Sequence, residues 1–384
     1  MIIAIRGLGG NVSTTMMLGL ELLRNGPMDR LQHGSSLMLP LWRNIPLPDL
    51  DTITFAGWDV CGDTIEARVR SAKILSETEI ESTPQPVRDM IPRLAPIRPG
   101  DVPPSMIKCD NAKHMSAGDA LAYFRRELSM LLERDSNLVG ANLSSAEAYN
   151  NIVNNINDID HLYALISSNS DCISSGMTFI VACIELGIPC FDFTADQSMD
   201  CPALGKLALN NKALLAGKDG NTGQTFLKVV LGEMFAKRNL KINDWYSTNV
   251  LGNLDGKVLS IPTHRQAKIQ DKALALASIL EYDFHHTVDI AYHPNRGDIK
   301  EAWDSIQLEG WLGHRISLRL NWYASDSILA APLVLDISRL LALSKERGEV
   351  GLQTQLSPFF KRPIGVTRTS IFHEFEVLER HYAI

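Results

Sequence analysis

The stretch IIAIRGLGGNVSTT, residues 2–15, decides the fold of this chain. Residues 2–5 form a short apolar run, which predicts a buried strand, and the apolar spacing after residue 15 predicts a helix. Between them, Gly7, Gly9 and Gly10 let the backbone approach a pyrophosphate, to which the start of the helix offers unpaired N–H groups. A strand, a glycine turn and a helix in this order indicate a parallel sheet that binds a dinucleotide.

Two later motifs also follow predicted strands. GWD ends at Asp59 after a strand expected at 53–56, where an acid commonly binds ribose hydroxyls, and NLSSAE (142–147) follows a strand expected at 137–141. Three alternatives stay open. The turn lacks a third glycine because Val12 occupies that position, Asp59 can cap a helix, and the serines of NLSSAE can do the same.

Helical and strand-like segments alternate through the first half of the chain. Helices are predicted at 117–134, 157–168 and 176–186, and strands at 137–141 and 188–194. Seven prolines between residues 84 and 105 predict a surface loop. The alternation predicts an α/β fold with a Rossmann-type doubly wound parallel sheet.

The pattern of predicted helices and strands changes after residue 204. Longer strand-like runs then alternate with helices, and an apolar helical face from Leu329 stops at Gly348. We therefore predict three parts. They are a nucleotide-binding Rossmann domain over 1–204, a second α+β domain over 205–312, and a segment over 313–384 that returns to the first domain.

Composition excludes several classes of partner. A net charge of -7 over 384 residues gives no global attraction for phosphate backbones, so nucleic acid is not expected. No run of 18 or more apolar residues occurs, so no membrane span is expected. The 6 cysteines include no CxxC pair, which fits neither a disulfide scaffold nor a zinc site and favours a reducing cytoplasm.

The segment AGKDGNTGQTFLKVVLGEMF, residues 216–235, concentrates polar groups just before a helix. Two hydroxyls, an amide and free backbone N–H groups meet there, and a phosphate group fits such a place. An ordinary helix cap is the alternative. The residues in question are Thr222, Gly223, Gln224 and Thr225.

Lysines form a further group of candidates. Lys268 and Lys272 lie four residues apart and share one face of a predicted helix. Repulsion between such like charges, about 0.2 to 0.5 kcal/mol, makes a neutral lysine easier to obtain for acid–base chemistry. A solvated helix face is the alternative. Lys300 and Lys361 join the pair only if the fold brings them close.

These motifs together resemble those of the myo-inositol-1-phosphate synthases, the short archaeal type more than the longer eukaryotic one. The resemblance runs nearly from end to end with the motifs in the same order. Its carriers are GLGGNVSTT (7–15), GWD (57–59), NLSSAE (142–147), AGKDGNTGQT (216–225), YSTNVLGNLDGKVLS (246–260), the Lys268 and Lys272 pair, DSILAAPLVLDI (326–337) and FFKRP (359–363).

The resemblance implies an NAD-dependent intramolecular lyase or isomerase that closes a hexose 6-phosphate into a carbocycle. In the family, tightly held NAD takes hydride from C5 of glucose 6-phosphate, and the C6 enolate then attacks the C1 aldehyde. The same hydride returns to C5, and an inositol 3-phosphate results. A homotetramer is also implied, with the middle domain catalytic and oligomerising.

Residue roles carry over by the same resemblance. Cations beside the developing alkoxide and enolate stabilise them, and loss of one such donor costs on the order of 10² to 10³ in rate. The implied catalytic residues are Lys268, Lys272, Lys300, Lys361, Asp219 and Asp326. Those implied for NAD are Gly7, Gly9, Gly10, Asn11, Val12, Asp59, Asn142, Ser145 and Asp255. The substrate phosphate is assigned to Thr222, Gly223, Gln224 and Thr225, with help from Lys272.

Departures from the family leave the substrate open. Most relatives have a lysine where this chain has Asn221, a lysine stands instead at Lys218, and the loop TADQSMDCPAL (194–204) is unusually acidic. Glucose 6-phosphate is the first expectation. The alternative is fructose 6-phosphate, whose C6 enolate attacks C2 and closes a five-membered cyclitol phosphate of the kind that carbocyclic nucleoside antibiotics need.

Two other functions compete with cyclisation. They are a dehydrogenase with net release of NADH and a non-catalytic NAD-binding protein, and the four lysines argue against both. A divalent metal or a monovalent cation stays open as a further cofactor, since some archaeal-type members need a divalent ion. His285, His286 and His293 are interpreted as structural, and no metal ligands are assigned.

Overall fold

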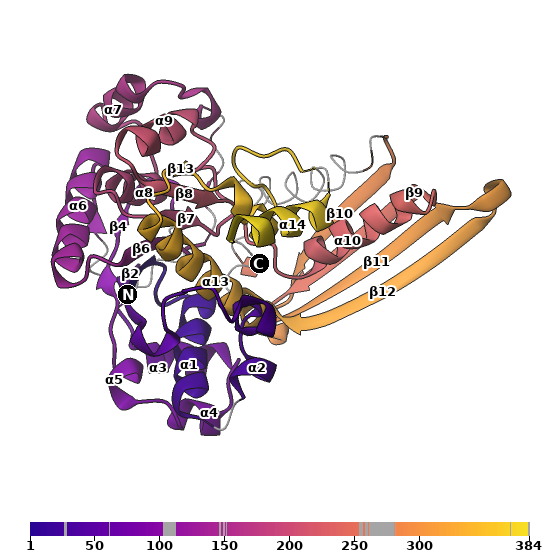
Figure 1. Ribbon diagram of the computed structural model, residues 1–384, viewed down its shortest axis with the longest axis horizontal. Helices are drawn as coiled ribbons and strands as arrows, with labels where there is room; N and C mark the ends of the chain where they lie inside the picture. The colour runs from indigo at the N-terminus through magenta and orange to yellow at the C-terminus, as the bar shows by residue number, and fades with distance from the viewer. Residues whose placement is uncertain are drawn as a thin grey trace.

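The computed structural model describes residues 1–26, 29–60, 62–102, 113–145, 147–148, 150, 152–252, 256–257, 260, 280, 282–368 and 370–382, without the side chain of residue 31. Two sheets dominate the described residues. One has seven strands and lies in the body of the molecule, and the other has four strands and projects from that body as an arm (Figure 1).

The seven-stranded sheet has the order β13-β8-β7-β6-β1-β2-β3, and all of its pairs are parallel. The first strand, β1 (Ile2–Arg6), lies in the middle, between β2 (Thr54–Asp59) and β6 (Leu138–Asn142). The order reverses there, and open α/β sheets bind ligands beyond the carboxyl ends of the strands at such a point. This confirms the predicted doubly wound sheet. Its other strands are β3 (Arg93–Leu94), β7 (Cys190–Asp192), β8 (Leu214–Gly217) and β13 (Gly351–Leu352).

Helices cover both faces of this sheet. On one face α1 (Asn11–Asn25) packs against α13 (Asp326–Glu346), and on the other α6 (Ala117–Arg134) packs against α8 (Ser175–Glu185). The other helices of the body are α2 (Arg30–His33), α3 (Ile65–Ala72), α4 (Glu77–Glu81), α5 (Gln85–Arg88), α7 (Ile159–Ser167), α9 (Pro202–Asn210) and α14 (Ile371–Tyr382). Short 3₁₀ turns lie at Ser36–Met38, Pro40–Trp42, Leu50–Thr52, Val153–Asn155, Pro294–Arg296, Trp311–Gly313 and Thr354–Phe359.

The helix α13 is long and apolar enough by length and composition to cross a membrane, but 78% of its most apolar window is buried inside the molecule. Its side chains pack with those of α1 and β1 in one core cluster. The apolar face that begins at Leu329 is therefore a core face, and β13 follows it as the edge strand beside β8. The chain thus returns to the seven-stranded sheet near its end.

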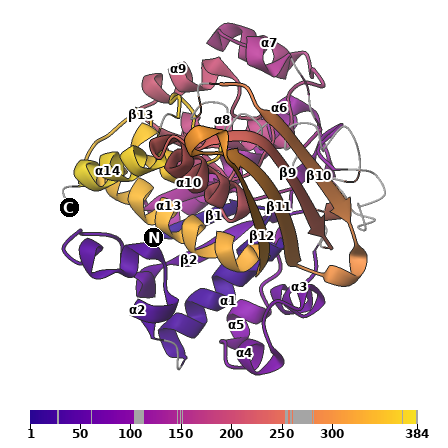
Figure 2. The same cartoon turned by 90° about the vertical axis from the view of Figure 1, so that its right-hand side faces the viewer.

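The arm consists of β10 (His285–Tyr292), β9 (Lys241–Leu251), β11 (Ile299–Glu309) and β12 (Arg315–Ser325), in that order. One face packs against α10 (Gln224–Lys237), as Figure 2 shows. Side chains alternate along β11, so that its even-numbered residues are buried and its odd-numbered residues face outward. Lys300 therefore points toward the same side of the sheet as α10.

Two sequence predictions need comment. The proline-rich stretch 84–105 is not simply a surface loop. It contains α5, and β3 pairs with the end of β2, because two residues suffice to extend a sheet at its edge. The three-part division at residues 204 and 312 stays a prediction. The sheets do not change at these residues: β8, after residue 204, still belongs to the seven-stranded sheet, and β12, after residue 312, still belongs to the arm.

Candidate active site

The glycines of the turn between β1 and α1 let it lie close to the end of the neighbouring strand β6. Gly7 has a φ of 95°, and a Cβ at this position would lie 2.7 Å from the backbone nitrogen of Ser144. Gly10 precedes α1 without a side-chain cap, and the first turn of α1 holds no acidic residue. The helix dipole is therefore left for an anion. Val12, in place of a third glycine, is half-buried and packs against the core.

Asp59 ends β2 beside this turn. The backbone N–H of Gly9 donates to Asp59 Oδ2 at 2.9 Å, and Arg68 Nη2 lies 3.8 Å from Oδ1. The next helix, α3, is capped by Thr64, whose hydroxyl accepts from the Ala67 N–H. The alternative of Asp59 as a helix cap is therefore wrong. The carboxylate instead holds the glycine turn from the end of the second strand.

Asn142 and Ser145 follow the neighbouring strand end. Asn142 is fully buried, accepts from Arg6 Nη1 at 3.1 Å and donates to Asp192 Oδ1 at 3.2 Å, so it ties β6 to β1 and β7. Ser145 is half-buried, and the next α-helix is capped by Asp158, so the serines do not cap it. The assignment of Asn142 and Ser145 to the cofactor stays a prediction.

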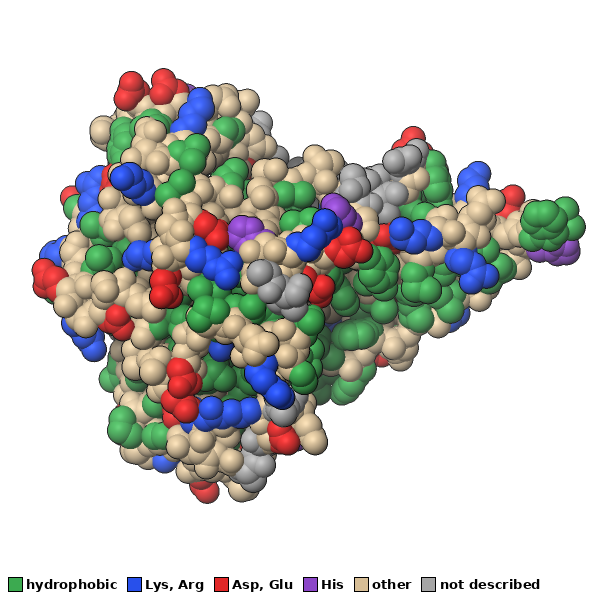
Figure 3. All heavy atoms as spheres, viewed as in Figure 1, with side chains coloured by type: hydrophobic (Ala, Val, Ile, Leu, Met, Phe, Trp, Pro, Cys, Tyr) green, Lys and Arg blue, Asp and Glu red, His purple; other side chains and the backbone are tan. Residues whose placement is uncertain are grey.

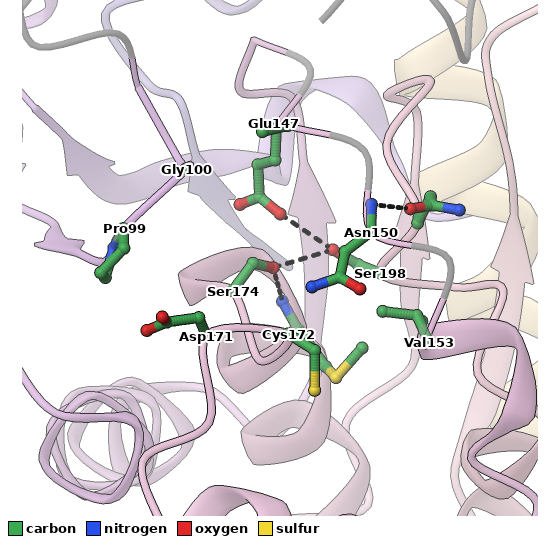
Figure 4. A pocket seen from close by; sticks show the side chains of 12 residues that line it. Pro99, Gly100, Glu147, Asn150, Val153, Asp171, Cys172, Ser174 and Ser198 are labelled. Carbon is green, nitrogen blue, oxygen red and sulfur yellow. Dashed lines mark hydrogen bonds between the residues drawn. The ribbon is translucent and has the colours of Figure 1, made fainter. Parts of the chain in front are cut away.

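A buried polar cluster extends from this motif to a small cavity (Figure 4). Glu147 accepts from Arg6 Nη2 at 2.9 Å and from the Gly176 N–H at 3.0 Å, and Ser198 Oγ lies 3.3 Å from its Oε2. Burial, and then the Asp196 carboxylate, raise the pKa of Glu147, although Arg6 opposes this shift. The cavity measures about 90 Å³, room for a few waters. No predicted site residue lines it.

The predicted phosphate residues lie at the start of α10. Gly223 is the N-cap and makes no side-chain cap hydrogen bond, and the first turn holds no acidic residue. The Thr222 hydroxyl does not cap the helix, because it donates instead to Asp326 Oδ1 at 3.3 Å. Gln224 and Thr225 are buried in the first turn. An uncapped helix start with its positive dipole is a suitable site for a phosphate group.

Two lysines reach this place from distant segments, each paired with a carboxylate. Lys361 Nζ donates to Asp219 Oδ1 at 2.6 Å, and backbone hydrogen bonds join residues 219–221 to residues 359–361. Lys300 Nζ lies 3.3 Å from Asp326 Oδ1, the oxygen that also accepts from Thr222. Four of the six predicted catalytic residues are thus linked to the segment that leads into α10.

Asp298 connects this group to the glycine turn at residues 7–10. Its Oδ1 accepts from Asn11 Nδ2 at 2.9 Å and from the Ser327 hydroxyl at 3.0 Å, and its Oδ2 accepts from the Ser325 hydroxyl at 2.5 Å. Asn11 begins α1, and Ser327 lies in the first turn of α13. Sequence reasoning missed Asp298, for which the available signal was its position two residues before Lys300.

Lys218 does not replace the lysine that most relatives place beside the phosphate loop. It is buried, and its Nζ donates to Asp200 Oδ2 at 2.7 Å and to the backbone carbonyl of Asp196. Arg362 Nη2 donates to the other oxygen of Asp200 at 3.2 Å. Both cations therefore hold the acidic loop at 194–200 in place.

Three predicted residues cannot be placed. Lys268, Lys272 and Asp255 lie outside the described residues, and their roles stay predictions. Within the described part of the chain, no group of three or more His, Cys, Asp or Glu side chains is arranged to hold a metal ion. The question of a metal or a monovalent cation therefore stays open.

Comparison with known proteins gives concordant results. The family described as myo-inositol-1-phosphate synthase matches residues 223–327. An inositol-3-phosphate synthase of Bacteroides thetaiotaomicron is 31% identical over 403 residues, which cover 98% of this chain and 90% of that protein.

Solved structures show the same fold. An inositol-3-phosphate synthase from Caenorhabditis elegans superposes with a TM-score of 0.88 at 21% identity, over 99% of this chain and 84% of that one. A myo-inositol-1-phosphate synthase-related protein from Thermotoga maritima superposes with a TM-score of 0.81 at 21% identity, over 100% of this chain and 98% of that one. The likeness therefore includes the body and the arm together.

Proposed function

The chain belongs to the myo-inositol-1-phosphate synthase family, and we propose that it closes glucose 6-phosphate into an inositol phosphate with NAD as a recycled cofactor. One observation carries the proposal. The uncapped start of α10 lies beside two lysine–carboxylate pairs, and Asp298 links that place to the glycine turn.

The glycine turn suits the cofactor. Gly7 lies so close to the backbone of Ser144 that a Cβ would collide with it, the start of α1 lacks a cap, and Asp59 stands at the end of the neighbouring strand. These groups would hold the pyrophosphate and a ribose of NAD. When bound, NAD supplies reversible hydride transfer, so that the net reaction is an isomerisation.

The lysine site would provide the charge stabilisation. Residues 222–225 bind the phosphate, and Lys300 and Lys361 lie beside the oxygens on which negative charge develops. Asp326 and Asp219 orient these ammonium groups. Lys300 and Lys361 are only 8% and 9% exposed, so their charges act with little screening by water. By family resemblance, Lys268 and Lys272 complete the set, and Asp255 lies near the nicotinamide.

We also propose a homotetramer assembled through the arm. Tyr246, Trp303 and Tyr323 lie on its outer face, 43%, 51% and 62% exposed. Trp311 and Leu312 at its tip are 84% and 78% exposed, and Figure 3 shows hydrophobic side chains along the arm and at the tip. Large apolar side chains gathered on one projecting element favour contact with another subunit.

The proposed location is the cytoplasm. Cys172, Cys183, Cys190 and Cys201, the cysteines within the described residues, are free and buried. Unpaired buried thiols are compatible with a reducing compartment.

Product analysis by NMR tests the proposed function. The purified protein would be incubated with NAD and, separately, with glucose 6-phosphate and fructose 6-phosphate. A six-membered cyclitol phosphate from the aldose, without accumulation of NADH, is the expected result. A five-membered product from the ketose would show that fructose 6-phosphate, and not glucose 6-phosphate, is the substrate. Steady formation of NADH would indicate a dehydrogenase. No turnover of either sugar would refute the proposal.

A further inference from the structure

Asp304 is a buried carboxylate on the face of β11 that packs against α10, four residues after Lys300. The Trp245 indole N–H and the Ser247 hydroxyl, both on β9, donate to its Oδ1 at 2.8 and 2.5 Å. Its Oδ2 accepts from Gln224 Nε2, in the first turn of α10, at 2.7 Å. One side chain thus joins two strands of the arm to the helix start.

The contact with Asp304 fixes the orientation of the Gln224 side chain. A carboxylate only accepts hydrogen bonds, so the amide nitrogen must face it. The amide oxygen of Gln224 is buried and has no hydrogen-bond partner among the described residues. No competing bond in that part of the chain therefore favours the flipped amide. The same hydrogen bond ties the first turn of α10 to β11.

Lys228, one turn farther along α10, adds a charge to this contact. Its Nζ lies 3.7 Å from Asp304 Oδ1 and 3.1 Å from His286 Nε2, and 5.5 Å from the centre of the Trp245 ring. Burial lowers the pKa of Lys228 to about 8, and Asp304 opposes the decrease. The helix is therefore held to the arm by two of its side chains, and both meet the same carboxylate.

We propose that Asp304 is a positioning residue for the phosphate of the substrate. Through Gln224 and Lys228 it holds the start of α10, and so it sets where residues 222–225 bind phosphate relative to Lys300. The proposal rests on the proposed function in placing the phosphate at this helix. Strand geometry separates the Cα atoms of Asp304 and Lys300 by about 13 Å, and the role proposed for Asp304 is therefore exerted through the helix start and not through Lys300.

Asp304→Asn tests this role. The new side chain keeps an acceptor for Trp245 and Ser247 but turns an N–H group toward Gln224, whose amide must turn over to accept from it. The hydrogen bond to a charged acceptor is thereby lost, and so is the charge that faces Lys228. Loss of a hydrogen bond to a charged group corresponds to about tenfold or more in affinity. We expect calorimetry to show at least this loss for inorganic phosphate and for glucose 6-phosphate. KM should rise more than kcat falls, and NAD affinity should not change.

A double-mutant cycle identifies the route. Gln224→Met removes the amide at similar volume, so in that background Asp304→Asn should act only through the charge that faces Lys228 and should weaken phosphate binding by less than it does alone. Additive losses would overturn the proposed action through Gln224. Asp244→Asn, the same substitution at a half-exposed position on β9, is the matched control and should leave phosphate affinity at the level of the unaltered protein.

The phosphate measurement needs no turnover, so the two proposals can fail separately. If the unaltered protein binds phosphate but does not cyclise a hexose phosphate, the proposed function fails and the role of Asp304 is still tested. Unchanged phosphate affinity in Asp304→Asn would overturn the inference alone. Failure of the unaltered protein to bind either phosphate compound would overturn the phosphate site at α10 and the inference with it.

Discussion

Replacement of Lys361 by alanine is the most direct perturbation of the lysine site. Lys361 and Asp219 form an ion pair with nitrogen and oxygen 2.6 Å apart and with side chains 9% and 5% exposed. Removal of the cation breaks this buried ion pair, which costs about 3 to 5 kcal/mol of unfolding free energy. It also removes a cation from the site of developing charge, so kcat should fall by about 10² to 10³.

A second variant separates these two effects. Lys361→Met combined with Asp219→Asn removes both charges of this pair, so most of the unfolding free energy should return while kcat stays low. Urea unfolding measures stability, product formation followed by NMR measures kcat, and fluorescence titration should show unchanged NAD affinity. A folded Lys361→Ala protein that turns over at the unaltered rate would refute the catalytic role.

Three further predictions concern the glycine turn, the core and the arm. Asp59→Ala removes the acceptor of the Gly9 N–H, so NAD affinity in a fluorescence titration should fall about tenfold, and an unchanged affinity would leave Asp59 without a role in binding. Burial raises the pKa of Asp336 from 3.8 to about 6. The contribution of this carboxyl group to the unfolding free energy is therefore complete below pH 3.8, and about 3 kcal/mol of it is lost as the pH rises through about 6. Asp336→Asn keeps an acceptor for the Ser36 hydroxyl and should raise the unfolding free energy at pH 7 and flatten its decline between pH 4 and 7. A slope like that of the unaltered protein would contradict this account. Trp303→Arg places a charge on the outer face of the arm and should yield smaller species in sedimentation velocity, whereas an intact tetramer would exclude that face from the subunit contact.

The parallel sheet was predictable because its signals are local. An apolar run, three glycines and a helical spacing lie within residues 2–25, and the helix at 117–134 was predicted with the bounds that the structure has. The strand β3 was missed because Arg93 and Leu94 lie between prolines, and its pairing depends on the end of β2. Such an edge strand is determined by its neighbour and leaves little pattern in its own residues.

The site was predictable only in part, for the same reason. Resemblance named Lys361 and Asp219, but they lie 142 residues apart, and no spacing rule pairs them. Asp298 and Asp304 were missed because their importance depends on tertiary contacts. Asp298 matters because α1 and α13 begin near each other, and Asp304 because β11 lies in register with β9.

The late position of Lys361 in the chain has a consequence for synthesis. Ribosomes add about 5 to 20 residues per second, so roughly 7 to 29 s separate the addition of Gly217, at the end of β8, from that of Lys361. During this interval the strands around the glycine turn have already been made, while the ammonium group that pairs with Asp219 does not yet exist. A nascent polypeptide therefore lacks the complete lysine site, and chemistry that depends on this lysine begins only after its translation.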